Sequence, residues 1–181
     1  MRSDRARERA VLNELEAAAR ALEETLSHLR ESPRRRRAET VEVPFSSLKG
    51  RLEAPVPGLL LRGFGRVLDD EFRTQTFRKG VDFAVEVGDP VYSVAEGEVR
   101  FAGWFRGYGK LVIIDHGEDY FTVLGHLEEI DVKVGHQVRG GDRIGVAGET
   151  GSLSGPRLYF EIRKGSGALD PAQWLLPVPE R

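Results

Sequence analysis

The feature that most constrains the fold is a series of short β-type runs that begins near Gly63 and continues without an intervening amphipathic helix. The runs are rich in β-branched and aromatic residues, and turns containing some of the chain's 21 glycines separate them. They occupy residues 81–87, 91–94, 98–101, 111–115, 121–124, 132–134, 144–147 and 158–162. Parallel strands would need crossover helices, so βαβ units are excluded. The pattern predicts a mainly β fold of antiparallel strands, a β-sandwich or barrel-sandwich hybrid.

Two segments of this β region resemble each other. Residues 87–91 read VGDPV and residues 134–138 read VGHQV, and each precedes a strand-like run. A hairpin used twice predicts an internally duplicated β motif. Biotin- and lipoyl-carrier domains have similar hairpins, but residues 134–147 contain no lysine to carry such a group, so we set that interpretation aside.

The N-terminal segment, residues 1–37, has a different composition. It contains no glycine and no aromatic residue, and its ten arginines and seven acidic residues give a net charge of +3. Apolar residues recur at alternating spacings of three and four, which is typical of a coiled-coil seam. The seam consists of Leu12, Leu15, Ala19, Leu22, Leu26 and Leu29. We expect a helix from about Asp4 to Glu31 that ends before Pro33.

We favour the interpretation that this helix is a coiled-coil segment. It would pack on a partner helix through residues 12–29 or continue a longer coiled coil. The alternative is a helix docked on its own domain. Four arginines, Arg34–Arg37, follow it and are interpreted as solvated linker charge. Residues 38–62 contain several prolines, which predicts an extended connector. We assign residues 63–176 to the β-domain and residues 177–181 to a tail.

Composition excludes several classes of protein. The net charge of −2 argues against a globally basic nucleic-acid binder. No apolar run approaches the roughly 18 residues of a membrane span, and the sequence as given shows no signal peptide. There is no cysteine, so disulfides and cysteine-ligated zinc are excluded.

The β-domain contains a series of short motifs in a fixed order. They are 77–82 (FRKGVD), 88–91 (GDPV), 95–99 (AEGEV), 107–109 (GYG), 114–117 (IDHG), 125–127 (GHL), 134–138 (VGHQV) and 155–163 (GPRLYFEIR). Over about residues 60–176 these motifs resemble the LytM/lysostaphin-type peptidase family. Active members of that family cut peptidoglycan cross-bridges with one zinc ion, held by an H-x-x-x-D motif and by the second histidine of an H-x-H strand. Alternate residues of a strand point to one face, so both imidazoles of H-x-H reach one site.

The sequence departs from the family at its metal ligands. The first ligand position holds Arg78, and H-x-H reads Arg157-Leu158-Tyr159, so of the three ligands only Asp82 remains, together with the assisting His126. A guanidinium has no lone pair to donate and stays protonated. We therefore predict no metal, no cofactor and no catalytic residue, and we expect an Arg78–Asp82 ion pair in place of the zinc–aspartate contact.

The chain combines a heptad helix, a connector and a peptidase-type domain that has lost its metal ligands. This order of parts resembles the EnvC-type murein hydrolase activators. In that group the vacated groove binds the regulatory helix of a zinc-dependent N-acetylmuramoyl-L-alanine amidase and activates it for peptidoglycan remodelling and cell separation. The resemblance implies a periplasmic or cell-envelope location and a non-catalytic regulator. The expected partner-binding groove consists of Arg78, Lys79, Asp82, Tyr108, His126, Arg157, Tyr159 and Arg163.

Strand periodicity supports this groove. Residues 157, 159, 161 and 163 share one face of a regular strand, and arginine and tyrosine are common interface anchors. Trp104 is interpreted either as a rim residue or as core, and His116 as structural. Two other functions stay open: an active zinc metalloendopeptidase with substituted ligands, and a peptidoglycan-binding scaffold.

Overall fold

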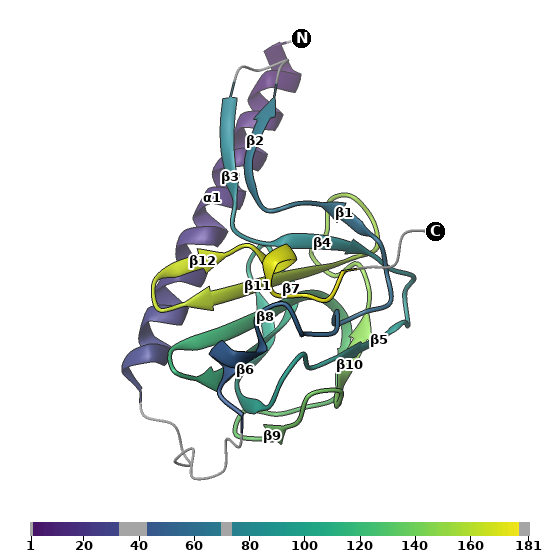
Figure 1. The fold of residues 1–181 in the computed structure, drawn as a ribbon. Coiled ribbons are helices and arrows are strands. Elements are labelled where there is room, and N and C mark those ends of the chain that lie inside the picture. The colour runs from purple at the N-terminus through teal and green to yellow at the C-terminus, as the bar shows by residue number, and fades with distance from the viewer. Residues whose placement is uncertain (1, 33–42, 70–73, 178–181) are drawn as a thin grey trace.

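The short β runs form an antiparallel sheet of ten strands, and one long helix lies against it (Figure 1). The structure is a computed structural model that describes residues 2–32, 43–69 and 74–177. Helix α1 comprises Arg2–Glu31. The strands are β1 (Leu60–Arg62), β2 (Gly65–Asp69), β3 (Thr74–Arg78), β4 (Val81–Ala84), β5 (Pro90–Tyr92), β6 (Gly97–Phe105), β7 (Gly109–Gly117), β8 (Tyr120–Ile130), β9 (Gln137–Val138), β10 (Arg143–Ala147), β11 (Arg157–Lys164) and β12 (Gly167–Leu169).

The large sheet runs in the order β1-β4-β11-β8-β7-β6-β9. Strand β12 adds to β11, and β10 pairs with both β8 and β5. All of these pairings are antiparallel. The prediction of a mainly β, antiparallel fold is therefore confirmed, and in the part of the chain that the structure describes the sheet does not close into a barrel.

Both faces of the central strands are buried, which explains their unbroken apolar runs. In β7, Leu111 and Ile113 pack toward the helix, whereas Val112 and Ile114 belong to the core on the opposite face. The opposite core also contains Phe83, Phe160 and Ile162, among others. Strand β8 alternates in the same way, so the two longest strands separate two apolar clusters.

Helix α1 docks on this sheet through the C-terminal half of its apolar stripe. Leu22 and Leu26 are each 2% exposed and pack with Leu111, Ile113 and two β8 side chains. Burying two leucines contributes on the order of 3 to 6 kcal/mol. The preferred interpretation, in which this half of the seam packs on a partner helix, is therefore wrong. In the structure this half docks on the β-domain of its own chain.

The guanidinium of Arg100 holds the C-terminal end of α1. Its Nη2 donates to the carbonyl oxygens of Leu29 and Ser32, each at 3.1 Å, while its Nη1 donates to Asp115 Oδ2 at 2.8 Å. The last carbonyls of a helix have no partner within the helix and carry partial negative charge, so a cation suits this position. Arg100 thus ties the end of the helix to strands β6 and β7.

The N-terminal half of α1 extends beyond the sheet, beside the β2–β3 hairpin (Figure 1). Here the apolar stripe is open: Val11, Leu12 and Leu15 are 41%, 38% and 45% exposed. A partner for this half stays a prediction. No helix in the described residues has the length and apolar character of a membrane span.

The region predicted to be an extended connector contributes to the core over its described residues. A 3-10 helix, Phe45–Leu48, places Phe45 against His116 and Trp174, with ring centroids 4.7 Å and 5.1 Å apart. Leu52 forms a parallel bridge with Leu175 near the other end of the β-domain. The Arg34–Arg37 run lies outside the described residues, as does most of the predicted tail, of which Pro177 alone is described.

The individual runs predicted as strands match the sheet closely, with one error. Residues 132–134 were expected to be a strand but form the irregular segment before β9. The β2–β3 hairpin and strands β1, β9 and β12 were not among the predicted runs. The hairpin is a two-stranded sheet of its own, and the side chains of Arg66, Val67 and Phe77 on it are exposed, so no buried apolar run marks these positions.

Candidate functional site

The pairing of β4, β11 and β8 positions the candidate groove. Tyr159 on β11 lies opposite Asp82 on β4 and opposite Gly125 on β8. Arg78 ends β3, and two residues separate it from the start of β4. Residues that are far apart in the sequence therefore converge on the outer part of β11.

The first group of side chains, which we call the Asp82 cluster, consists of Arg78, Asp82 and Arg157. Asp82 Oδ2 accepts hydrogen bonds from Arg78 Nη2 at 2.8 Å and from Arg157 Nη1 at 2.9 Å. Arg157 Nη2 also donates to the carbonyl oxygen of Ser154 at 3.1 Å. The side chain of Asp82 is only 5% exposed, so its charge is removed from water and compensated by two guanidinium groups.

The residues at this position do not fit the zinc ion that the peptidase fold implies. The one remaining carboxylate is already bonded to two cations, which would repel a divalent cation. Across the described residues there is also no group of three or more histidine, cysteine, aspartate or glutamate side chains arranged to hold a metal. The donor set therefore supports no zinc-dependent step.

His126 lies next to this cluster as a neutral imidazole. Its side chain is largely buried, and burial lowers its pKa, although a hydrogen bond to Thr150 and the charge of Asp82 oppose this effect. Its Nδ1 donates to the carbonyl oxygen of Thr150 at 2.8 Å, which leaves Nε2 as an acceptor. His126 adopts a φ of 62°, and its backbone N–H donates a hydrogen bond to the carbonyl oxygen of Tyr108 at 2.7 Å, which helps to fix this conformation.

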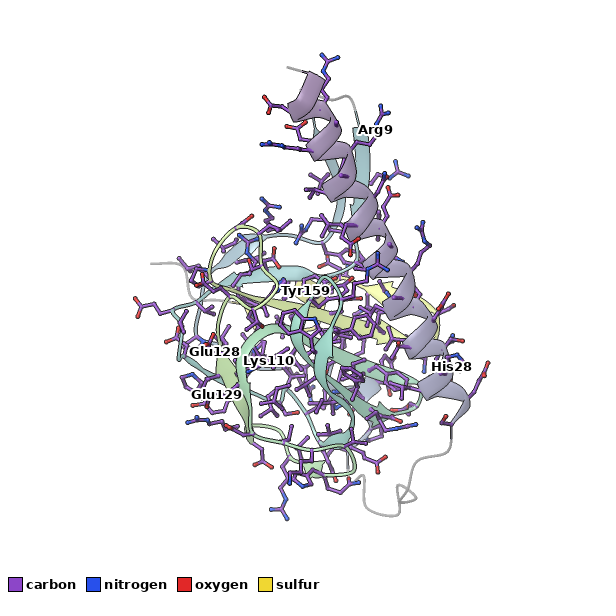
Figure 2. All side chains as sticks on the ribbon, turned by 180° about the vertical axis from the view of Figure 1, so that it is seen from behind. Arg9, His28, Lys110, Glu128, Glu129 and Tyr159 are labelled. Atoms are coloured by element: carbon purple, nitrogen blue, oxygen red, sulfur yellow. The ribbon has the colours of Figure 1, made fainter. Side chains whose placement is uncertain are left out.

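Two tyrosines form the aromatic wall of the site. The rings of Tyr108 and Tyr159 are 5.2 Å apart, and that of His126 is 6.4 Å from Tyr159. Burial raises the pKa of both phenols, so they remain neutral hydrogen-bond donors. In Figure 2, Tyr159 lies on the sheet beside α1, whereas Arg9 lies on the part of the helix that extends past the sheet.

A second group, the Glu161 cluster, consists of Glu161, Arg163, Glu23 and Lys79. Glu161 accepts from the Tyr159 hydroxyl at 2.8 Å and from Arg163 Nη1 at 3.1 Å. Arg163 also donates to Glu23 of the helix, and Lys79 Nζ donates to the other oxygen of Glu23 at 2.7 Å. This cluster therefore links the groove to α1.

Opposing effects set the ionisation of the two glutamates. Burial raises the pKa of Glu161 to about 7, although the charge of Arg163 and the Tyr159 hydroxyl lower it. For Glu23, burial also raises the pKa, but the hydrogen bonds from Lys79 and Arg163 outweigh it and leave the pKa below its ordinary value. At neutral pH Glu23 is charged while Glu161 is partly protonated.

Helix α1 approaches the groove closely. A Cβ on Gly107 would lie 2.4 Å from the Cβ of Ala18, so only glycine, here at a φ of +81°, allows this contact. On the same stretch Arg106 Nε donates to Glu14 at 2.6 Å. The helix thus lies along one side of the groove from Glu14 to Glu23.

The structure brings all eight predicted groove residues together. Arg78, Asp82 and Arg157 form one cluster, the rings of Tyr108, His126 and Tyr159 adjoin it, and Lys79 and Arg163 meet through Glu23. That they bind a partner stays a prediction.

Sequence reasoning missed two participants in the groove. Glu161 was placed on the correct face but not among the site residues, and its position two residues from both Tyr159 and Arg163 was the available signal. Glu23 lies beside the leucine stripe, and nothing in its local sequence indicates a contact 140 residues away.

The other residues considered from sequence lie outside the groove contacts. Trp104 is 64% exposed, so the core interpretation is wrong. His116 is 1% exposed and held by Glu96 and Thr122 at 2.7 Å and 2.8 Å, as expected of a structural histidine.

Comparison with known proteins gives relatives of both kinds, activators and enzymes. The chain is 36% identical over 127 residues to the murein hydrolase activator EnvC of Escherichia coli, which covers 70% of this chain and 29% of that protein. It is also 36% identical over 117 residues to the DD-carboxypeptidase/endopeptidase Mpg of Neisseria meningitidis, covering 65% and 27%. The chain thus spans less than a third of the length of either relative.

Solved structures agree with the fold. A crystal structure of a zinc-containing peptidase from Vibrio cholerae superimposes with a TM-score of 0.65 at 31% identity, covering 71% of this chain and 41% of that one. The profile of Peptidase family M23 matches residues 76–171, more than half of the sequence and the whole of the groove except the helix. The chain belongs to Peptidase family M23.

Proposed function

We propose that this chain is a non-catalytic regulator of peptidoglycan hydrolysis that binds and activates a zinc-dependent N-acetylmuramoyl-L-alanine amidase. The observation that carries the proposal is the Asp82 cluster. In it two arginines form ion pairs with Asp82, the one carboxylate that remains at the family's zinc-ligand positions. Such a groove can bind a partner, but its donor set does not fit the zinc ion that would activate water for hydrolysis.

The chemistry of the groove suits a polypeptide partner. Tyr108 and Tyr159 offer aromatic surface with hydroxyl donors, and arginines on either side offer fixed cationic donors. These residue types are enriched among the side chains that dominate protein interfaces. An amphipathic helix with acidic residues, such as the regulatory helix of an amidase, would match this surface.

The relatives support a role at the cell wall. One is named as a murein hydrolase activator and another as a DD-carboxypeptidase/endopeptidase, and murein lies in the cell envelope. We therefore propose that this chain acts in the cell envelope, in the periplasm.

Dye release from labelled peptidoglycan tests the proposal. The chain alone should release no dye, and it should stimulate a cognate amidase. Tyr159→Ala should remove the stimulation, whereas Tyr92→Ala, at another partly buried tyrosine on β5, should retain it. Circular dichroism would confirm that both variants fold.

Two outcomes would replace this function with an alternative. Dye release by the chain alone, lost on treatment with a chelator, would indicate a metalloendopeptidase. Binding to purified sacculi without stimulation of any amidase would indicate a peptidoglycan-binding scaffold.

A further inference from the structure

The Asp82 cluster carries more positive charge than the described residues around it neutralise. It contains two guanidinium groups and one carboxylate, and the neighbouring His126 is neutral because burial lowers its pKa. The Glu161 cluster beside it supplies no compensating negative charge, since its two cations face two glutamates, of which Glu161 is partly protonated at neutral pH. A surplus of one positive charge therefore remains in a partly buried position.

The hydrogen-bond donors of the cluster are also in excess. Each guanidinium has five N–H donors. Among the described residues Arg78 has a single acceptor, Asp82, and Arg157 has two, Asp82 and the Ser154 carbonyl. The Nε atoms of both arginines are buried without any acceptor. Unpaired donors of this kind are costly, so an arriving acceptor would be stabilised.

The charge and shape of the cluster select the kind of anion. The surplus is a single charge, and Asp82 remains close by, which disfavours a phosphate of nearly two negative charges. A carboxylate carries one charge and has the planar, two-oxygen geometry that matches a guanidinium. Chloride matches the charge but cannot form a bidentate pair.

The groove already holds one carboxylate that does not come from the β-domain. Glu23 of α1 is bound by Lys79 and Arg163, on the other side of Tyr159. The Asp82 cluster has the same type of donors and no such carboxylate. Arg78 and Arg157 remain 23% and 12% exposed, so the cluster is reachable from solvent.

We propose that the Asp82 cluster is a carboxylate-binding subsite, in which Arg78 and Arg157 receive an aspartate or glutamate side chain of the partner polypeptide. That the carboxylate comes from a polypeptide, and not from a small molecule, rests on the proposed function. Because Tyr159 lies opposite Asp82 in the sheet, a segment anchored there also contacts the aromatic wall.

Acetate serves as the probe for the subsite. Two-dimensional 1H–15N NMR spectra of the full chain resolve the Nε–Hε signals of buried arginines, and acetate is added at constant ionic strength with chloride as the balancing ion. The signals of Arg78 and Arg157 should shift in a saturable way. The absence of a saturable shift overturns the proposal, and so does inorganic phosphate binding more tightly than acetate.

Matched variants assign the binding to the cluster. Arg157→Gln should weaken acetate binding by about tenfold or more, whereas Arg139→Gln, in the exposed turn after β9, should leave it unchanged. Asp82→Asn removes the competing carboxylate and should tighten acetate binding by about tenfold. Equal affinity in wild type and Arg157→Gln would overturn the proposal even if both bind acetate.

The amidase assay separates this proposal from the proposed function. Stimulation that Arg157→Gln leaves intact overturns the subsite while the regulatory function stands. Saturable acetate binding by a chain that stimulates no amidase supports the carboxylate subsite and overturns the regulatory function.

Discussion

The two charged clusters of the groove lie on either side of Tyr159 but are built in opposite ways. In the Asp82 cluster one carboxylate has two cations, and all three residues belong to the β-domain. In the Glu161 cluster one arginine, Arg163, lies between two carboxylates, one of which comes from the helix. The first cluster has one more cation than carboxylates, whereas in the second two cations face two carboxyl groups, of which Glu161 is partly protonated at neutral pH.

This difference indicates how each cluster should respond to the loss of one arginine. Removing one arginine from the Asp82 cluster leaves the carboxylate paired with the other. Removing Arg163 leaves Glu161, which is 1% exposed, without its cation. We therefore expect the Asp82 cluster to tolerate the loss of one arginine, and the Glu161 cluster to fix the position of the helix.

The largest effect is expected from Arg163→Met. This change leaves Glu161 buried and uncompensated, so the free energy of unfolding at pH 8 should fall by about 3 to 5 kcal/mol. Urea denaturation measures it. Arg143→Met, which disrupts an exposed pair with Asp131, should cost less than about 1 kcal/mol. Similar losses in the two variants would contradict the contrast between the clusters.

The next largest effect is a pH dependence that originates in Glu161. Its pKa is about 7 in the folded protein and near 4.5 when unfolded, so between these values the folded state holds a proton that the unfolded state has released. Its contribution to stability is thus complete below pH 4.5 and is lost as pH rises through 7, on the order of 3 kcal/mol in total.

Glu161→Gln should remove this dependence. Thermal unfolding followed from pH 5 to pH 8 should show a shallower decline in the variant than in the wild type. Parallel curves for the two proteins would show that another group is responsible.

A smaller effect is expected from Arg78→Gln. Arg157 still pairs with Asp82, so the loss of stability should be about 1 kcal/mol. The double variant Arg78→Gln/Arg157→Gln should lose more than the sum of the single changes, because Asp82 is then buried alone. Additive losses in urea denaturation would mean that the two arginines do not substitute for each other.

The smallest effect is expected from Lys79→Gln. The Lys79–Glu23 pair is 39% and 32% exposed, so its loss should cost about 0.5 kcal/mol. Hydrogen exchange of the α1 amides near Glu23 should increase slightly, whereas Lys133→Gln, in the turn before β9, should change neither quantity. A loss comparable to that of Arg163→Met would show that Lys79, and not Arg163, is the main attachment of the helix.

Sequence reasoning reached the β-domain because its signals are local. The run Leu111–Ile114 and the alternating strand 157–163 are recognisable from residue types alone, and the same alternation placed Arg157 and Tyr159 on one face with Glu161 and Arg163. The Arg78–Asp82 contact was expected, and the structure has it at 2.8 Å. The second arginine on Asp82 was not expected, since it depends on the pairing of β4 with β11.

The helix was harder to predict, because a heptad pattern does not specify what covers it. Leu22 and Leu26 would fit a partner helix as well as they fit the sheet, and only the tertiary structure selects between them. Leu12 and Leu15 belong to the same pattern but extend past the sheet. The heptad periodicity therefore predicted the helix correctly, but the partner helix inferred from it was wrong for Leu22 and Leu26, which pack on the sheet.

The contacts of α1 with the β-domain begin at Glu14, and their order along the helix has a mechanical consequence. A helix of 30 residues is a stiff rod about 45 Å long. Arg100 anchors its C-terminal end, and its opposite end extends clear of the sheet. A sideways load on the free end would strain the Arg106–Glu14 pair first, then the contacts of Glu23, and only then those of Arg100.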